Sequence, residues 1–492
     1  MSSTDLDPFF KPKSVAVIGA SREPRKFGHV IFKNFVESEF KGKAYPVNPK
    51  AESILGLKTY PSVKEVPSEL DLAVIAVPAP MVPPIIDECL SKDVKAAIII
   101  SGGFKEVGEK GEELELEIRE KIKDSGLRII GPNCIGVYDP INHIDTLFLP
   151  RYRLRRPKEG PIAFISQSGA FGSAVLDWAA SQDIGISKFI SIGNKIDVDE
   201  VDILNYLVDD SLTKCITVYV ESISRGREFL KASSRVAKNK PLIVLKGGVT
   251  NEGASASLSH TGSLAGSAKV CAGAFKQAGV VQAQTVDELL DYARTLAYQP
   301  LPKDQKNIAI VTNGGGFGVI STDEASGLGL KLAKFNPETV RTLREKLPEY
   351  AIVHNPLDLV GDADVERYRS ALDAVSSDPN VGIILVIVLL QTSFIESDVV
   401  DAITESQVTY GKPTVVCTIG GEFTQILVKM LEENRIPSYP TPERAVNAIN
   451  ALIQYAKALE DINKKQQLNE RGTAQAGRVT KRNTTCRWPS PS

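Results

Sequence analysis

The first candidate for chemistry in this chain is His260, one of four histidines among 492 residues. It stands among Gly, Ser and Ala residues between Asn251 and Gly266. Small side chains let a backbone segment move and approach a partner closely. The sequence therefore predicts a mobile loop that carries a nucleophilic histidine, although a surface histidine without a role would show the same pattern.

A histidine that accepts a phosphoryl group needs a carboxylate on its other ring nitrogen and positive potential around the phosphate. Glu221 directly follows an apolar run, so it is expected at the carboxyl edge of a sheet. Two small-residue turns precede helices and could offer free N–H groups to the phosphate: Ser168 and Gly169 in one, and Gly314, Gly315 and Gly316 in the other. A surface salt bridge for Glu221 and simple turn chemistry for the glycines are the plainer alternatives.

A further polar candidate is Asn194, which is also expected at a sheet edge. From that position it could meet an acyl group or a phosphate.

A nucleotide site is predicted at the first strand and turn of the chain. Gly19 permits a tight turn after an apolar run, but the G-x-G-x-x-G fingerprint is absent. The next predicted strand is followed by Asn48, where a dinucleotide site would have a carboxylate for the ribose hydroxyls. Arg22 adds positive charge near the turn. These features favour coenzyme A, with its 3′-phosphate, over NAD, and a bare turn without a ligand is the alternative. The other candidate binding residues lie in strand-end loops: Ala20, Ser21, Val77, Pro78, Ser101, Gly102 and Asn133.

The elements that must position these residues indicate an α/β protein. Apolar runs rich in Val and Ile alternate with amphipathic stretches, which is typical of parallel strands covered on both faces. This alternation of strand-like and helix-like segments starts again after linkers at 150–161 and 300–306, so we expect three doubly wound parallel-sheet domains. The expected bounds are 1–150, 151–302 and 303–461, followed by a disordered or non-native tail at 462–492.

The composition excludes several classes of protein. Lys and Arg number 58 against 60 Asp and Glu, so no nucleic-acid partner is expected. No apolar run approaches the ~20 residues that span a bilayer, and no signal peptide is recognised. The six cysteines are scattered without a CxxC pair, which predicts neither a metal site nor a disulfide framework. The sequence therefore predicts a cytoplasmic protein without a membrane partner.

Several motifs together resemble the nucleoside-diphosphate-forming acyl-CoA synthetases. They occur in order over about 460 residues: GAS at 19–21, VPAP at 77–80, GPNC at 131–134, SQSG at 166–169, SHTGSLAG at 259–266 and NGGG at 313–316. The first two domains are also similar to the α subunit of succinyl-CoA synthetase, and the third to the ligase region of its β subunit.

The resemblance implies a Rossmann-like CoA-binding domain followed by two flavodoxin-like ligase domains. His260 would be the family's phosphohistidine and Glu221 the carboxylate that holds it, with the glycine turns clasping the phosphate. Acyl-CoA, phosphate and ADP would give acid, CoA and ATP through an acyl phosphate. We find no ATP-grasp module and no P-loop. ADP/ATP and Mg²⁺ are therefore expected on a separate ATP-grasp β subunit, in a heterotetramer or larger α/β assembly of archaeal type.

Other interpretations remain open at this point. An α/β-hydrolase could use Ser168, although the first position of G-x-S-x-G is Ser166 here. A CoA-binding regulatory or scaffold module would leave His260 idle. A CoA-dependent lysine acetyltransferase is disfavoured, because the tail is too short for its catalytic domain.

Overall fold

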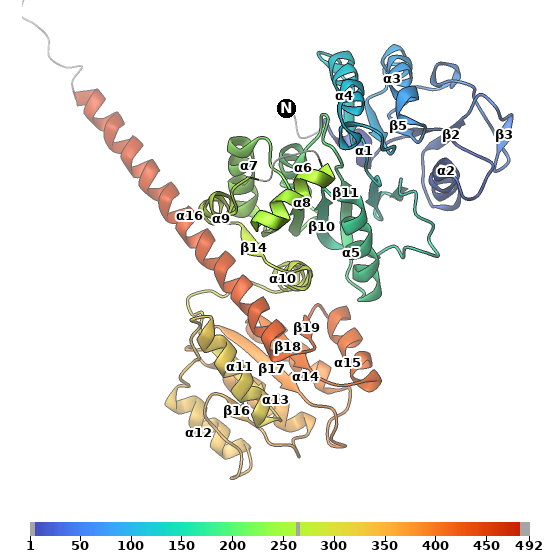
Figure 1. The fold of residues 1–492 in the computed structure, drawn as a ribbon. Coiled ribbons are helices and arrows are strands. Elements are labelled where there is room, and N and C mark those ends of the chain that lie inside the picture. Colours follow the sequence, from blue (N-terminus) through green and yellow to red (C-terminus); the bar gives the residue numbers. More distant parts are fainter. Residues whose placement is uncertain (1–4, 262–265, 483–492) are drawn as a thin grey trace, which may run out of the picture.

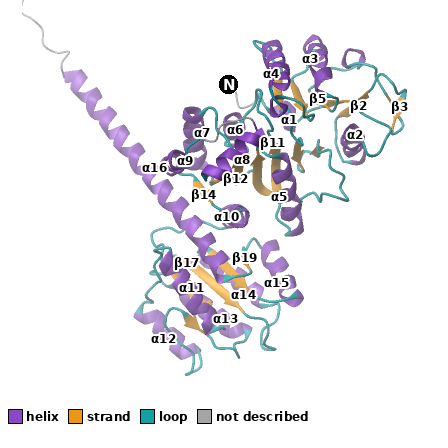
Figure 2. Ribbon diagram, in the orientation of Figure 1, coloured by secondary structure: helices purple, strands orange, loops and turns teal. Residues whose placement is uncertain are grey.

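The computed structural model describes the backbone of residues 5–261 and 266–482, with the side chains of 5–256 and 266–464. It confirms the predicted α/β class. Three mainly parallel sheets with flanking helices follow one another along the chain, from blue through green to orange in Figure 1. Helices and strands alternate in each of them (Figure 2). The parallel strands of every sheet, numbered in chain order, lie in the order 2-1-3-4-5.

The first sheet has the order β2-β1-β5-β6-β7, and all its pairs are parallel. Its central strands are wholly buried, as expected for a sheet covered on both faces. The strands are β1 Ser14–Ile18, β2 Lys43–Val47, β5 Leu72–Ile75, β6 Ala96–Ile99 and β7 Arg128–Ile130, with a small hairpin of β3 Ser53–Ile54 and β4 Leu57–Lys58. The helices are α1 Asp7–Phe10, α2 Phe27–Glu37, α3 Val82–Ser91 and α4 Glu109–Ile122, with 3-10 turns η1 Val63–Glu65, η2 Ala79–Met81 and η3 Lys105–Val107.

The second sheet has the order β14-β13-β12-β10-β11-β8-β9. Its strands are β8 Val137–Asp139, β9 Ile144–Asp145, β10 Glu159–Ser166, β11 Ile186–Ser191, β12 Cys215–Val220, β13 Leu242–Lys246 and β14 Val281–Ala283. The helices are α5 Gly169–Ser181, α6 Glu200–Leu207, α7 Gly226–Asn239, α8 Asn251–Thr261, α9 Ala268–Ala278 and α10 Val286–Tyr298. The hairpin of β8 and β9 pairs antiparallel with β11, so this part of the range 1–150 extends the second sheet and not the first.

The third sheet has the order β16-β15-β17-β18-β19 and is parallel throughout. Its strands are β15 Ile308–Thr312, β16 Leu357–Asp358, β17 Ile383–Val388, β18 Thr414–Thr418 and β19 Ser438–Tyr439. The helices are α11 Gly315–Gly327, α12 Pro337–Lys346, α13 Val365–Ser377, α14 Val399–Tyr410, α15 Glu422–Glu433 and α16 Pro442–Arg482.

Two segments differ from the sequence-based expectation. The stretch before and including His260 is helix α8 and not a loop, although its side chains are small. Helix α16 continues to Arg482, so the chain is helical well into the range predicted as a disordered tail; residues 483–492 lie outside the described part. The first part of α16, from Ala445 to Tyr455, packs in a hydrophobic cluster, and the helix continues beyond it.

The second and third domains share one hydrophobic core. Helix α16 leaves the third sheet and passes along α10, with further contacts to α7 and β14 of the second domain (Figure 1). The shared cluster joins residues of the second sheet, such as Phe164, to residues of the third, such as Leu385. Within the described residues, no helix combines the length and the apolar character needed to cross a membrane.

Candidate functional site

The common strand order predicts where each sheet binds a ligand. In the order 2-1-3-4-5, the loops after the first and third strands leave on opposite faces, and the crevice between them is the usual binding position. In the first sheet these loops begin at Gly19, after β1, and at Ala76, after β5. In the second sheet they carry Ser168, after β10, and Glu221, after β12. Several sequence-predicted residues, such as Gly19, Ser168 and Glu221, therefore flank these crevices.

The candidate CoA-binding residues gather at the edge of the first sheet. Gly19 has φ +87°, and a Cβ there would collide with the carbonyl of Ala76, so only glycine fits this turn. Asn48 donates from Nδ2 to the carbonyl of Ala20 at 2.7 Å, which joins the end of β2 to the turn. The hydroxyl of Ser101 donates to the carbonyl of Val77. Hydrogen bonds thus connect the predicted loops at the edge of the first sheet, where Arg22 and Pro78 are exposed.

The turn before α5 is held by its own side chains. Ser168 is the N-cap of α5, and its Oγ accepts the N–H of Phe171 at 3.3 Å. Gln167 joins this turn to the loop after β12, because its Oε1 accepts the N–H groups of Glu221 at 2.8 Å and Ser222 at 3.1 Å. Gln167 was not predicted as a site residue, although it lies inside the SQSG motif.

Glu221 is 5% exposed and is fixed from several sides. The phenol of Tyr219 donates to its Oε1 at 3.2 Å, and Nζ of Lys246 donates to its backbone carbonyl at 2.7 Å. Burial, together with the carboxylate of Glu221, raises the pKa of Tyr219, so this phenol remains a donor. Lys195 donates to the next carbonyl, that of Ser222, at 2.8 Å. Hydrogen bonds therefore hold both the backbone of Glu221 and one oxygen of its carboxylate.

Asn194 lies in the loop after β11 and reaches across to the first domain. Its Nδ2 donates to Glu106 Oε2 at 2.7 Å and to Glu115 Oε1 at 2.6 Å. Asn133 Nδ2 lies 3.4 Å from Asn194 Oδ1, and Lys105 Nζ donates to the Asn194 carbonyl at 3.1 Å. The predicted substrate residue is thus part of a polar contact between the two domains.

The two carboxylates of this contact have different electrostatic surroundings. Burial raises the pKa of Glu115, although the hydrogen bond from Asn194 works against it. Burial also acts on Glu106, but hydrogen bonds from Asn194 and from the N–H groups of Gly103 and Phe104 prevail and lower its pKa.

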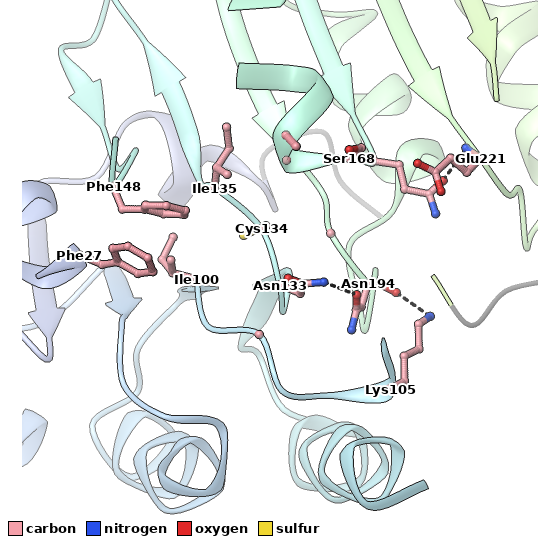
Figure 3. Close-up of a pocket in the computed structure, with 15 residues that line it drawn as sticks. Phe27, Ile100, Lys105, Asn133, Cys134, Ile135, Phe148, Ser168, Asn194 and Glu221 are labelled. Atoms are coloured by element: carbon pink, nitrogen blue, oxygen red, sulfur yellow. Dashed lines mark hydrogen bonds between the residues drawn. The ribbon is translucent and has the colours of Figure 1, made fainter. Parts of the chain in front are cut away.

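A cavity of about 320 Å³ lies between the first two domains (Figure 3). It brings together six of the predicted residues: Gly102, Asn133, Ser168, Gly169, Asn194 and Glu221. It also contains residues that the sequence did not reveal: Phe27, Ile100, Lys105, Cys134, Ile135, Phe148, Gln167, Ala170 and Gly193. Cys134 is buried there, and burial raises the pKa of its thiol to about 12, so it is no thiolate nucleophile.

His260 belongs to helix α8, but its side chain lies outside the described residues. The helix itself lies next to η3, whose Lys105 faces the cavity. The helix that carries His260 is therefore close to an element that links the two domains.

The glycine turn of the third domain has its own surroundings. Gly314, Gly315 and Gly316 stand at the start of α11 and are not among the described residues that line the cavity. Asn313 donates from Nδ2 to the carbonyl of Leu389 at 3.0 Å, and its Oδ1 accepts the N–H of Leu389 at 2.9 Å. It thereby ties the loops after the first and third strands of its sheet, as Gln167 does in the second sheet.

Three family models match successive parts of the chain. A CoA binding domain covers residues 13–140, a succinyl-CoA ligase-like flavodoxin domain covers 159–296, and a ligase-CoA domain covers 308–463.

Related proteins cover nearly the whole chain. The α subunit of ADP-forming acetate–CoA ligase II from Pyrococcus furiosus is 43% identical over 92% of this chain and 98% of its own length. ADP-forming acetate–CoA ligase I of Archaeoglobus fulgidus is also 43% identical over 92% of this chain, which spans 64% of that longer protein. The structure of the Ca. Korarchaeum cryptofilum dinucleotide-forming acetyl-coenzyme A synthetase 1, solved with phosphate and ADP, has a TM-score of 0.88 and 39% identity. That match covers 94% of this chain and 99% of the other. The chain therefore belongs to the family of the ADP-forming acetate–CoA ligases and corresponds in extent to their α subunits.

Proposed function

We propose that this chain is the α subunit of an ADP-forming acid–CoA ligase, an enzyme that makes or breaks a carbon–sulfur bond. The overall reaction is acyl-CoA, phosphate and ADP to acid, CoA and ATP. The observation that carries the proposal is the cavity between the first two domains. It meets the edge that would bind CoA at Gly102 and the predicted phosphate clasp at Ser168 and Glu221.

The chemistry follows from what this cavity brings together. A phosphate held at the N-terminus of α5 attacks the thioester carbon, the C–S bond breaks, and CoA leaves as the thiol after taking a proton. A ring nitrogen of His260 then attacks the phosphorus of the acyl phosphate, and the carboxylate of the acid leaves. Glu221 accepts the other ring N–H of His260 and stabilises its positive charge.

The remaining half of the reaction requires a second protein. In this proposal a separate ATP-grasp β subunit binds ADP and Mg²⁺, and phosphorylated His260 delivers the phosphoryl group there. The longer relative from A. fulgidus supports this division, because it extends beyond the part that this chain matches. We place the assembly in the cytoplasm, since the cysteines among the described residues are all free.

Phosphorylation of the isolated chain tests this function. The chain is incubated with acetyl-CoA and radiolabelled phosphate, and acid-labile, base-stable label is measured on the protein. We expect label on the wild type and none on His260→Asn. The matched control is His143→Asn, a partly exposed histidine at left-handed φ +57°, where asparagine is tolerated.

Label that persists in His260→Asn would contradict the assignment of the nucleophile. A wild type that stays unlabelled, both alone and with an ATP-grasp subunit, would contradict the function as a whole. Phosphate-independent ester hydrolysis lost in Ser168→Ala would instead support a hydrolase, but Ser168 caps a helix here and the family of the chain does not favour that interpretation.

A further inference from the structure

The cavity between the first two domains has two chemically different ends. Ser168, Gly169 and Glu221 form a polar end that belongs to the second domain. The opposite end is apolar, and Phe27, Ile100, Ile135 and Phe148 line it. Figure 3 shows the two phenylalanines on one side of Cys134 and the polar group on the other.

A stacked aromatic pair closes the apolar end. The ring centroids of Phe27 and Phe148 lie 4.1 Å apart, with 27° between the planes. Phe27 begins α2 and is 52% exposed, whereas Phe148 is partly buried and packs against two hydrophobic clusters, one of which joins the first two domains. Ile100 and Ile135 form the fixed walls, with 4% and 7% exposure. The pair therefore ends a pocket whose sides are formed by buried residues.

The direction of a bound thioester follows from these two ends. The carbonyl carbon must lie near the phosphate at the polar end, and the sulfur must point to the CoA edge, which the cavity meets at Gly102. The third substituent of that carbon is the acyl chain, and an apolar chain is stabilised where it is removed from water. The large apolar side chains of the cavity lie at the end closed by the aromatic pair, whereas the small Cys134 and Ala170 lie elsewhere in its lining.

We propose that Phe27 and Phe148 form the end wall of the acyl pocket and limit the length of the acid that the enzyme accepts. This inference rests on the proposed function, since it names the substrate class of the same site. The cavity of about 320 Å³ is at the lower end of the ~300–1,000 Å³ that small-molecule sites usually have. It must hold phosphate as well as the acyl group, so the substrates are short-chain acids.

Binding measurements on the full chain test the pocket without requiring turnover. Dissociation constants are measured by calorimetry for free CoA, acetyl-CoA and hexanoyl-CoA. In the wild type we expect acetyl-CoA to bind more tightly than hexanoyl-CoA. In Phe27→Ala, in Phe148→Ala and in the double variant, the preference should shift toward hexanoyl-CoA by about tenfold or more, because each accommodated methylene contributes a factor of this order.

The control variant is Phe394→Ala, which removes a phenylalanine of similar exposure, 57%, from the third domain. It should leave the preference unchanged. Because Phe27 is half-exposed, its removal is not expected to prevent folding, whereas Phe148→Ala alone could do so.

Two outcomes would overturn the proposal. Equal weakening of free CoA and both thioesters would mean that the aromatic pair contacts the pantetheine arm. If the ratio of the dissociation constants for acetyl-CoA and hexanoyl-CoA is unchanged in all variants, the aromatic pair contacts neither the acyl chain nor the pantetheine arm. Failure of the proposed function can be distinguished from failure of this inference. If only the proposed function is wrong, His260 remains unlabelled while the thioester preference still shifts in Phe27→Ala.

Discussion

At the scale of single residues, the carboxylate of Glu221 depends on three neighbouring side chains. Gln167 fixes its backbone N–H, Lys246 its carbonyl and Tyr219 its Oε1. A buried polar network that is well satisfied holds its members in one geometry. The histidine that meets this carboxylate would therefore find an acceptor already oriented.

Replacement of this carboxylate by its amide tests the role. Glu221→Gln keeps the size of the side chain but removes the charge that would stabilise an imidazolium. We expect the initial rate of His260 phosphorylation from acetyl-CoA and phosphate to fall about a hundredfold or more. Glu228→Gln, on the exposed face of α7, should phosphorylate at the wild-type rate. Equal rates in wild type and Glu221→Gln would remove Glu221 from the reaction.

The sequence predicted some residues around the cavity and missed others for a physical reason. Ser168 and Glu221 follow apolar strands, and strand ends meet at one edge of a sheet, so their position could be inferred locally. Phe27 and Phe148 are 121 positions apart and meet only because the first domain packs against the second. No local pattern of hydrophobicity carries that information. The roles of all these residues remain predictions.

At the scale of elements, the polar contact around Asn194 joins α4 and η3 of the first domain to the loop after β11. Glu106 and Glu115 both accept hydrogen bonds from one amide nitrogen, so their carboxylates lie close together. Burial, with a smaller contribution from the charge of Glu106, raises the pKa of Glu115, so Glu115 retains its proton more readily than an ordinary glutamate.

A pH-dependent stability follows from the raised pKa of Glu115. The folded chain binds this proton more tightly than the unfolded chain does, so stability is lost as pH rises from about 4.5 through the folded pKa. Glu115→Gln keeps a hydrogen-bond acceptor without a charge. We therefore expect the Tm of the variant minus that of the wild type to be larger at pH 8 than at pH 5.

The control for this experiment is Glu112→Gln, which lies on the exposed side of the same helix. Its Tm difference should not change between the two pH values. A difference for Glu115→Gln that stays constant with pH would show that this carboxyl group is ionised in the folded chain at both values.

Elements were predicted well where apolar periodicity was strong and poorly where it was weak. The strands β1, β12 and β17 are apolar runs, and they are strands in the structure. Helix α8 has few large side chains, so the sequence indicated a loop. In the structure α8 lies next to η3, a tertiary neighbour that the sequence pattern does not contain.

At the scale of the whole molecule, a buried ionic cluster fastens the second domain to the third. Arg294 of α10 donates to Glu432 Oε1 of α15 at 2.9 Å and to the carbonyl of Ser438 at 3.1 Å. Its guanidinium lies 4.7 Å from the ring centroid of Tyr439. Asp291, beside Arg294, binds Arg444 of α16 at 2.7 Å. Together with the shared core, this cluster makes the two domains one unit.

Removal of the Arg294 guanidinium should lower the stability of the unit formed by the second and third domains. Arg294→Ala leaves Glu432 buried without its partner, and breaking such a pair costs about 3–5 kcal/mol. We expect a Tm lower by several degrees, measured by differential scanning calorimetry, and partial recovery in Arg294→Met combined with Glu432→Gln. Arg341→Ala, which breaks an exposed pair with Glu338, should change the Tm little. A similar Tm for both single variants would mean that the cluster does not stabilise the molecule.

The hairpin of β8 and β9 has a consequence for any attempt to divide the gene. A fragment that ends near residue 150 would carry this hairpin away from β11 and leave an open strand edge on the remainder, which is a template for aggregation. A fragment that ends after β7 would keep the first sheet whole but would lack Asn133 and Ile135, and with them part of the cavity wall. The first two domains therefore cannot be separated without dividing the cavity that they form together. In chimaeras with related proteins, we expect an intact cavity only where both domains come from the same parent.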